Sequence, residues 1–290
     1  MEPVAQLHVG CPSWAHRPWV GRFLPADTRP GTELHAYSRR VNAVEGNTTF
    51  YASPQPATVA KWAAQALPGF RFIFKVPQTI THHKRLRDTD AELAAFLDLI
   101  EPLHGVVGAL TLQLPASFGP TDLATLDSVL RGLSRQWRWS VELRHPAFFT
   151  GTTRLAVDRV LSTHGAERVL LDSRPLFARP PLTDPGRDAW SRKPRIPALQ
   201  QPLTDQPIVR LIGSDHTDVT AAGLERWVPT LAQWIRDGRS PTFFVHTPDN
   251  DDTLGLALEF HAAVAALVPG LAPLPHAEAA AAEPDQPTLF

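Results

Sequence analysis

The segment Val41-Asn42-Ala43-Val44-Glu45-Gly46-Asn47 passes within a few residues from strand-forming apolar side chains to polar ones. Seven further runs of the chain end in the same way. The eight runs are residues 7–10, 41–45, 70–76, 107–114, 140–143, 169–171, 208–212 and 243–245. Segments with helical periodicity lie between most of them. This alternation predicts an α/β fold in which a parallel sheet closes into a (β/α)₈ barrel of the TIM type.

The segments between the strands predict the outer helices of this barrel. They lie at residues 33–40, 57–67, 91–103, 122–135, 154–164, 221–237 and 254–267. Residues 174–207 are different because they contain eight prolines, which leave little room for an outer helix. We therefore expect an irregular sixth crossover, and a loop of that length in a compact domain is usually functional or disordered.

The chain divides into one large domain and a short tail. A barrel of about 250 residues is ordinary for this fold, so residues 1–270 are expected to form a single domain. Residues 271–290 are rich in proline, alanine and acidic side chains, which favours a flexible tail. The tail ends in Gln286-Pro287-Thr288-Leu289-Phe290.

Composition excludes several classes of protein. Hydrophobic residues make up 43% of the chain and charged residues 20%, as in a globular domain with a full core. The formal net charge of −1 gives no overall attraction to nucleic acid or membrane, and the single cysteine, Cys11, excludes an intrachain disulfide framework. The chain shows neither a signal peptide nor an apolar run of the roughly 20 residues that span a bilayer. We expect a cytoplasmic protein without a membrane partner.

The polar residues at the strand ends are the candidate site, because barrels of this type place their sites where strands end and the following loops begin. Glu45 and Asn47 lie two residues apart and share one face of their strand, so both should point into the barrel mouth. From this position we expect catalytic roles for Glu45, Lys75, Glu142, Asp172 and His246. Ligand-binding roles are expected for Trp14, Asn47, Tyr51, His82, Gln113, Arg144, His145, Arg174, Arg192, Lys193, Arg210 and Asp249.

Structural roles compete with these functional ones. Glu142 and Arg144 share a strand face and would also form a buried ion pair that only stabilises the barrel. Glu45 and Lys75 lie on neighbouring strands and would pair in the same way. His82, followed by His83, would equally belong to a solvated turn. The sequence leaves these alternatives open.

The distribution of charge favours an anionic ligand. Residues 174–195 carry six cations against two aspartates, and they belong to the same face as the basic loops after the first and third strands. The aromatic residues expected around the mouth are Trp14, Trp19, Phe50, Tyr51 and Trp190. Cations suit phosphates, and aromatic rings suit bases or sugars. The mouth is therefore expected to bind nucleic acid or another phosphate-bearing ligand.

A divalent metal is a further alternative for the same mouth. The carboxylates expected on the inside are Glu45, Glu142 and Asp172, and with His145 and His246 they would support metal-assisted phosphodiester chemistry. No pair of histidines has the spacing of a helical metal site. The metal therefore stays undetermined.

With these residues assembled, the chain resembles the YecE-like family, domain of unknown function 72. The matching stretches are residues 44–51, 72–76 with 81–82, 112–115, 141–146, 171–175, 193–197, 210–215 and 246–249. The resemblance implies a TIM-like barrel over about residues 7–270 and, by likeness to barrel endonucleases of the endonuclease IV type, nucleic-acid binding. The chain departs from many relatives at Ile212, where a histidine is common, and at His246-Thr247-Pro248-Asp249, which indicates a subfamily.

The C-terminal residues resemble a second known pattern. Gln286, Leu289 and Phe290 match the pentapeptide with which bacterial proteins bind the sliding clamp, where a glutamine and a final Leu-Phe pair anchor an extended peptide. The resemblance implies the sliding clamp as a partner.

Three functions are therefore expected to compete. The first is a DNA-maintenance protein that binds nucleic acid at the mouth and is tethered to the clamp by its tail. The second is an isomerase, lyase or hydrolase for a phosphorylated or sugar-like substrate, in which Lys75 or Glu142 acts as acid, base or Schiff-base nucleophile. The third is a non-catalytic adaptor.

Overall fold

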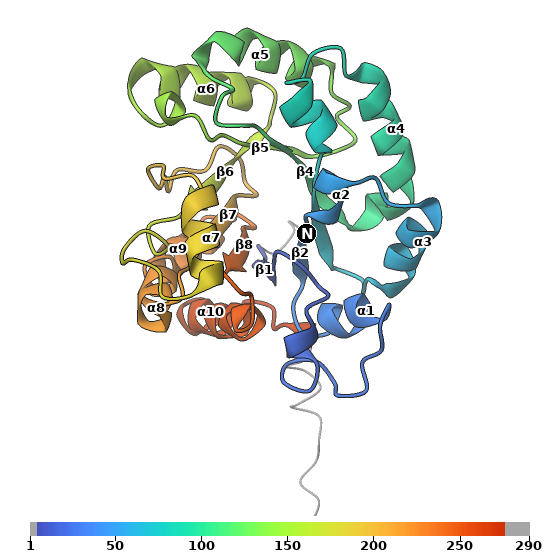
Figure 1. The fold of residues 1–290 in the computed structure, drawn as a ribbon, viewed down its shortest axis with the longest axis vertical. Coiled ribbons are helices and arrows are strands. Elements are labelled where there is room, and N and C mark those ends of the chain that lie inside the picture. The colour runs from blue at the N-terminus through green and yellow to red at the C-terminus, as the bar shows by residue number, and fades with distance from the viewer. Residues whose placement is uncertain (1–4, 276–290) are drawn as a thin grey trace, which may run out of the picture.

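Eight parallel strands form a closed barrel in the computed structural model, which describes residues 5–275 (Figure 1). Each strand pairs with the next along the chain, and the last pairs with the first. The strands are β1 His8–Cys11, β2 Ala43–Gly46, β3 Arg71–Lys75, β4 Val107–Gln113, β5 Trp139–Glu142, β6 Glu167–Asp172, β7 Ile208–Ile212 and β8 Thr242–His246. The predicted (β/α)₈ barrel is confirmed.

Helices surround the barrel and connect its strands. They are α1 Glu33–Ser38, α2 Thr48–Tyr51, α3 Pro56–Gln65, α4 Asp90–Ile100, α5 Leu123–Gly132, α6 Gly151–Thr163, α7 Asp184–Arg192, α8 Thr217–Glu225, α9 Val228–Arg236 and α10 Thr253–Leu267. The prediction of a single helix over residues 221–237 is wrong, because the helical structure is interrupted between α8 and α9. Trp227 is fully buried at this break, and Pro229 lies in the first turn of α9, where the missing N–H costs no hydrogen bond.

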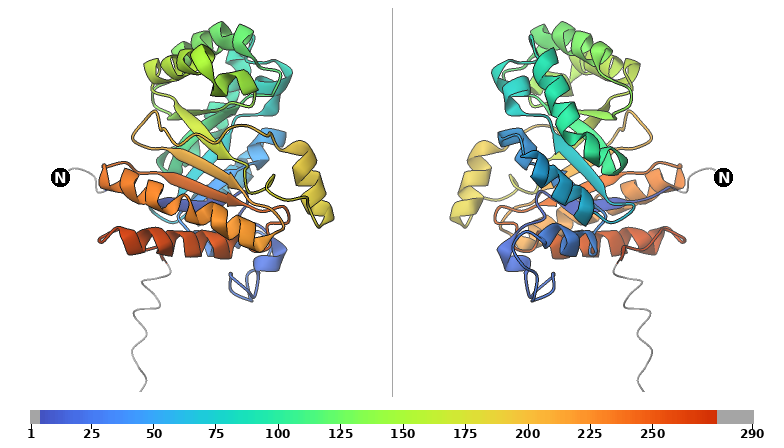
Figure 2. Two further views of the ribbon diagram at one scale, coloured as in Figure 1. Left: turned by 90° about the vertical axis from the view of Figure 1, so that its left-hand side faces the viewer. Right: turned by 90° about the vertical axis from the view of Figure 1, so that its right-hand side faces the viewer.

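The sixth crossover is irregular, as expected, but it is not without structure. It contains α7, which begins at Thr183, whose side chain accepts a hydrogen bond from the N–H of Gly186 at 3.0 Å. In the side views α7 stands away from the ring of outer helices, at one end of the barrel (Figure 2). Residues of α7 line the same pocket as the strand ends, so this helix lies over one side of the barrel mouth.

The interior of the barrel has an apolar layer below a charged one. The apolar layer consists of Ala43, Ile73, Ala109, Val169, Ile208 and Phe244, all at most 3% exposed. Side chains alternate between the two faces of a strand, so the residues two positions further along point inward again. On β2, β3, β7 and β8 these residues are Glu45, Lys75, Arg210 and His246. The charged layer therefore lies at the C-terminal ends of the strands.

Two further expectations from the sequence concern the C-terminal pentapeptide and membrane-spanning helices. Gln286, Leu289 and Phe290 lie outside the described residues. Within residues 5–275, no helix has both the length and the apolar character needed to cross a membrane.

Candidate functional site

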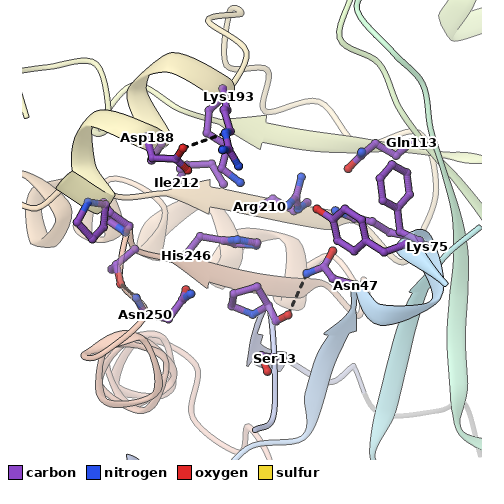
Figure 3. A pocket seen from close by; sticks show the side chains of 18 of the residues that line it. Ser13, Asn47, Lys75, Gln113, Asp188, Lys193, Arg210, Ile212, His246 and Asn250 are labelled. Carbon is purple, nitrogen blue, oxygen red and sulfur yellow. Dashed lines mark hydrogen bonds and ion pairs between the residues drawn. The ribbon is translucent and has the colours of Figure 1, made fainter. Parts of the chain in front are cut away.

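A pocket of about 600 Å³ opens at the C-terminal end of the barrel, between the strand ends and α7 (Figure 3). The labelled side chains of Arg210, His246 and Asn47 come from different strand ends and point toward the same space. Ten residues that the sequence assigned to the site line this pocket. They are Asn47, Tyr51, Lys75, His82, Gln113, Arg144, Arg192, Lys193, Arg210 and His246.

Two carboxylates and two arginines form the floor of the pocket. Arg210 bonds to both Glu45 and Glu142, with its Nη2 3.1 Å from Oε2 of Glu45 and its Nη1 bonded to Oε2 of Glu142. Arg144 holds the other oxygen of Glu142, with Nη2 at 2.7 Å, and Asn47 donates to Glu45 at 2.8 Å. The four charges of this network cancel. The ion pair expected between Glu142 and Arg144 is confirmed.

The network keeps both carboxyl groups ionised. Burial alone would raise the pKa of Glu45 and Glu142, which are 2% and 0% exposed. The positive charges of Arg210 and its neighbours outweigh burial and hold both pKa values well below their usual range. Neither carboxyl is therefore available as a general acid near neutral pH.

Lys75 is a further cation added to a network that is already balanced. Its side chain is buried, and its Nζ lies 3.5 Å from Oε2 of Glu45, an oxygen that Arg210 and Asn47 already contact. The expected pairing of Glu45 with Lys75 is thus present but long. Burial, followed by repulsion from Arg210, lowers the pKa of Lys75 to about 8, although Glu45 and Glu142 oppose this change.

Several buried polar atoms of residues that line the pocket have no hydrogen-bond partner within residues 5–275. They include Oε1 of Gln113 and Nε2 of His246, two residues that are 4% and 5% exposed. The Nε2 atom of His246 lies 3.6 Å from Oε2 of Glu45, too far for a hydrogen bond. Burial, followed by the charge of Arg210, holds the pKa of His246 well below its usual value, so the imidazole is neutral. A buried polar atom without a partner costs about 1–3 kcal/mol. A ligand that offered a donor to Gln113 would recover part of that cost.

The rim of the pocket is mainly cationic. Arg192 and Lys193 reach it from the end of α7, where Nε of Arg192 lies 2.9 Å from Asp188. His82 packs edge-on against Phe50, and burial together with Arg144 lowers its pKa to about 4, so it is neutral. Five cations line the pocket, against Asp188 and the two floor carboxylates among the described residues. The site therefore has a formal excess of two positive charges.

Asp172 and Arg174 lie outside this pocket. Asp172 accepts a hydrogen bond from Nε1 of Trp227 at 2.9 Å and binds Arg174 through two further contacts of 2.9 and 2.7 Å. It follows Leu171, which shares the inward face with Val169, so its own side chain points outward toward the helices. The expectation that Asp172 faces the barrel interior is wrong.

Three other expected ligand-binding residues are also placed elsewhere. Nδ1 of His145 accepts a hydrogen bond from the N–H of Ala147 at 3.2 Å, which begins a short 3₁₀ turn. Trp14 packs edge-on against Trp62 of α3, with ring centroids 5.2 Å apart. Asp249 lines a neighbouring cavity of about 300 Å³. These positions give none of the three a direct contact with the main pocket.

The aromatic rim is smaller than the sequence suggested. Phe50 and Tyr51 line the pocket, and Tyr51 is 72% exposed. Trp19 is fully buried, and Trp190 packs against Phe177 on the crossover segment. Gln78 and Asp188 also line the pocket, although neither was among the residues expected from the sequence. A signal for Gln78 existed, since it directly follows the third strand and Pro77.

The donor set of the pocket does not fit a divalent metal. Within residues 5–275, no group of three or more histidine, cysteine, aspartate or glutamate side chains is arranged to hold a metal ion. The oxygens of Glu45 and Glu142 are engaged by Arg210 and Arg144, which a metal would have to displace. Asp172 and His145, two of the five expected ligands, lie outside the pocket.

Comparisons with known proteins agree on the family. A family model described as "Protein of unknown function DUF72" matches residues 8–279. The UPF0759 protein YecE of Escherichia coli K12 is 39% identical over 244 residues, which is 84% of this chain and 87% of that protein. A second YecE protein, from Escherichia coli O157:H7, matches with the same identity and coverage.

Solved structures show the same barrel. A DUF72 family protein from Enterococcus faecalis V583 superposes with a TM-score of 0.67 at 16% identity, covering 91% of this chain and 95% of that one. A DUF72 family protein from Thermotoga maritima MSB8 gives a TM-score of 0.65 at 21% identity, covering 89% of this chain and 98% of that one. These likenesses concern the fold. With the family model and the 39% identical relative, they lead to one conclusion: the chain belongs to the DUF72 family, to which the sequence stretches around Glu45 and Glu142 had pointed.

Proposed function

We propose that the barrel mouth binds a small phosphate-bearing ligand, of about the size of a mononucleotide or a sugar phosphate. The observation that carries the proposal is the uncompensated positive charge at the pocket. The floor network of Arg210, Arg144, Glu45 and Glu142 cancels within itself. Lys75 and the rim cations then leave an excess that a phosphate dianion neutralises.

The side chains at the rim suit phosphate in particular. The guanidinium of Arg192 offers a planar pair of donors that matches two phosphate oxygens, and Lys193 adds a compact positive charge. Burial, followed by Arg210, lowers the pKa of Lys193, which a bound anion would reverse. A phosphate therefore gains charge-assisted hydrogen bonds from several cations at once.

The deeper wall suits the rest of such a ligand. The unpartnered Oε1 of Gln113 requires a donor, which a sugar hydroxyl or a base amino group supplies. The volume of about 600 Å³ falls within the usual range for small-molecule sites. A DNA duplex is too wide to enter a pocket of this size, so nucleic acid would bind here through a phosphorylated strand end.

Matched pairs of probes test this proposal by titration calorimetry at pH 7. The pairs are AMP and adenosine, glycerol 3-phosphate and glycerol, and a thymidine decamer with a 5′-phosphate and one with a 5′-hydroxyl. We expect the phosphorylated member of at least one pair to bind about tenfold more tightly or better, since hydrogen bonds to charged groups contribute about 1.5–3 kcal/mol each.

The three pairs separate the sources of the phosphate. Binding of AMP or glycerol 3-phosphate supports a small-molecule site. Binding of the phosphorylated decamer alone supports a strand-end site in DNA maintenance, and its affinity should fall steeply with salt. Equal binding of both members in every pair would overturn the proposal.

We also propose, from the sequence alone, that the C-terminal pentapeptide binds the bacterial sliding clamp. Gln286, Leu289 and Phe290 carry the resemblance. Immobilised clamp should retain the full chain, and it should release a variant in which Leu289 and Phe290 are both replaced by alanine. Equal retention of the two proteins would contradict this partner.

A further inference from the structure

We propose that Lys75 is a nucleophile that forms an imine with the carbonyl group of a phosphorylated aldehyde or ketone. The phosphate half of this substrate class rests on the function proposed above. The carbonyl half rests on the position of Lys75 in the floor of the pocket. Three features of that position support it: the charge balance, the access of Nζ to the pocket, and the neighbouring groups.

The charge balance gives Lys75 no structural task as a cation. Arg210 and Arg144 already neutralise Glu45 and Glu142, with contacts of 3.1 and 2.7 Å among them. A buried lysine that only held an ion pair would need a carboxylate of its own, and Glu45 at 3.5 Å is already engaged by Arg210. A buried charge without such a partner is costly. Buried ionisable groups that destabilise the folded state in this way are typical of functional sites.

The access of Lys75 suits attack on a ligand. The residue ends strand β3, so its backbone is held by the barrel rather than by a loop, and its side chain lines the pocket while being 5% exposed. Below it lies the apolar layer that includes Ile73 and Ala109. The cations of α7 approach from the opposite side of the opening in Figure 3, where Lys193 and Lys75 are both labelled. A ligand that spans the pocket can therefore place its phosphate at the rim and its carbonyl at Lys75.

The protonation state of Lys75 also suits a nucleophile. With a pKa of about 8, roughly a tenth of the amine is neutral at pH 7, compared with well under a thousandth for an ordinary lysine. Neutral amine is the form that attacks a carbonyl. Burial sets this pKa first, followed by the charges of Arg210, Glu45, Glu142 and Arg144. The neutral His246 and His82 line the same pocket.

The chemistry needs no reagent beyond the substrate. The lone pair of Nζ forms a C–N bond to the carbonyl carbon, and the carbonyl oxygen takes up the proton that Nζ releases. The resulting carbinolamine then loses its hydroxyl together with the remaining proton of Nζ as water, which breaks the C–O bond and leaves a C=N bond. His246 lines the same pocket, and its Nε2, 3.6 Å from Oε2 of Glu45, has no hydrogen-bond partner within residues 5–275. Protonation of the imine gives an iminium ion, an electron sink suited to isomerase or lyase reactions.

Reductive trapping tests the proposal on the full chain. Glyceraldehyde 3-phosphate is incubated with the protein and sodium cyanoborohydride, which converts any iminium ion into a stable secondary amine. Peptide mass mapping then locates the adduct. The chain has four lysines, Lys61, Lys75, Lys84 and Lys193, so each one is followed separately. We expect Lys75 to be labelled at least about tenfold faster than the exposed Lys61 and Lys84, with half-maximal rate near pH 8.

The comparison of lysines within one protein makes the result independent of folding in a variant. Lys75→Arg keeps the charge and should lose the labelled peptide, and Lys61→Arg, which changes an exposed residue of α3, should keep it. Labelling of Lys61, Lys84 or Lys193 with Lys75 unlabelled would overturn the proposal.

Failure of this proposal is distinguishable from failure of the proposed function. If AMP or glycerol 3-phosphate binds in the calorimeter but Lys75 stays unlabelled, the phosphate site stands and the nucleophile is refuted. If Lys75 is labelled equally fast by glyceraldehyde and by glyceraldehyde 3-phosphate, the nucleophile stands and the preference for phosphate is refuted.

Discussion

Each end of the barrel buries a glutamate, but the hydrogen-bond donors around its carboxylate are neutral at one end and charged at the other. Glu167 at the N-terminal end accepts hydrogen bonds from the N–H groups of Leu203 and Thr204, both at 3.0 Å, and from the Thr204 hydroxyl at 2.6 Å. Glu142 at the C-terminal end is held by Arg210 and Arg144. Both glutamates are 0% exposed. The pKa of Glu167 is raised because burial dominates over these neutral donors, whereas the pKa of Glu142 is lowered by its arginines.

The difference separates a stabilising end from a binding end. At the N-terminal end, backbone N–H groups and a hydroxyl of the chain itself donate hydrogen bonds to the carboxylate. At the C-terminal end, arginines balance the carboxylates, Lys75 exceeds that balance, and Gln113 and His246 keep unpartnered atoms within the described residues. Uncompensated positive charge and buried polar atoms without a hydrogen bond both favour a bound ligand at this end.

Removal of the bridging arginine should have the largest effect at the binding end. Arg210→Leu leaves Glu45 and Glu142 buried without their common counter-ion. We expect the free energy of unfolding at pH 7 to fall by about 3–5 kcal/mol, as for other broken buried pairs, measured by urea denaturation. A loss below about 1 kcal/mol would mean that Arg210 does not hold the floor together.

Replacement of the surplus lysine should have the opposite sign. Lys75→Met removes a buried charge that no carboxylate balances by itself, so we expect the free energy of unfolding at pH 7 to rise by roughly 1–3 kcal/mol. The pKa of Lys75 is about 8 in the folded chain and near its ordinary value of 10.5 when unfolded. The unfolded state thus binds more protons between these two pH values, and wild-type stability gains relative to the variant as pH rises from 8 to 10.5.

Urea titrations of both proteins at pH 7, 8, 9 and 10.5 measure this difference. The gap between variant and wild type should shrink steadily above pH 8, because the charge that destabilises the folded wild type is lost. A constant gap over this range would show that Lys75 does not titrate there. A less stable variant at pH 7 would show that its charge is needed for folding.

The glutamate at the stabilising end should respond more weakly. Glu167→Gln keeps the shape and one acceptor oxygen but turns an amide donor toward the donors of residues 203 and 204. We expect a loss of about 1–2 kcal/mol by urea denaturation, smaller than for Arg210→Leu, and unchanged affinity for the phosphorylated probe that binds wild type. A change in that affinity would contradict the division between the two ends.

The rim of the pocket should affect affinity and hardly affect stability. Arg192→Gln removes one exposed cation from the pocket. Arg187→Gln is the control, because Arg187 lies on the same helix and pairs with Asp184 but does not line the pocket. Affinity for the phosphorylated probe should fall about tenfold for the first and stay within about twofold for the second, measured by calorimetry. Equal losses would indicate a general charge effect rather than a site.

Much of this arrangement follows from the sequence, because each strand ends with a change from apolar to polar residues. Glu45 and Asn47 could be placed together in the mouth from their spacing of two, and Asn47 donates to Glu45 at 2.8 Å, although Asn47 lies just beyond β2, at the start of α2. Asp172 could not be placed, since the run before it, residues 169–171, is apolar throughout. Strands of a parallel barrel are buried on both faces, so such a run does not reveal which residues point inward.

The crossover that contains α7 shows the same limit for a different reason. The prolines of residues 174–207 correctly argued against an outer helix, and Pro185 instead lies in the first turn of α7. Local sequence does not show that this short helix lies over one side of the mouth, because its start is held by Asp215 of the loop after β7, which accepts hydrogen bonds from the N–H groups of Leu182 and Thr183. The ion pairs of the pocket floor also join distant parts of the chain. Arg210 is 165 residues from Glu45 and 68 residues from Glu142.

The most direct test of the account is a calorimetric comparison of AMP with adenosine, of glycerol 3-phosphate with glycerol, and of the 5′-phosphorylated decamer with its 5′-hydroxyl counterpart. If the mouth is a phosphate site, a phosphate group should strengthen binding about tenfold or more in at least one pair, and Arg192→Gln should remove most of this gain. Equal affinities within all three pairs would contradict the claim that the positive excess at the barrel mouth is a phosphate site.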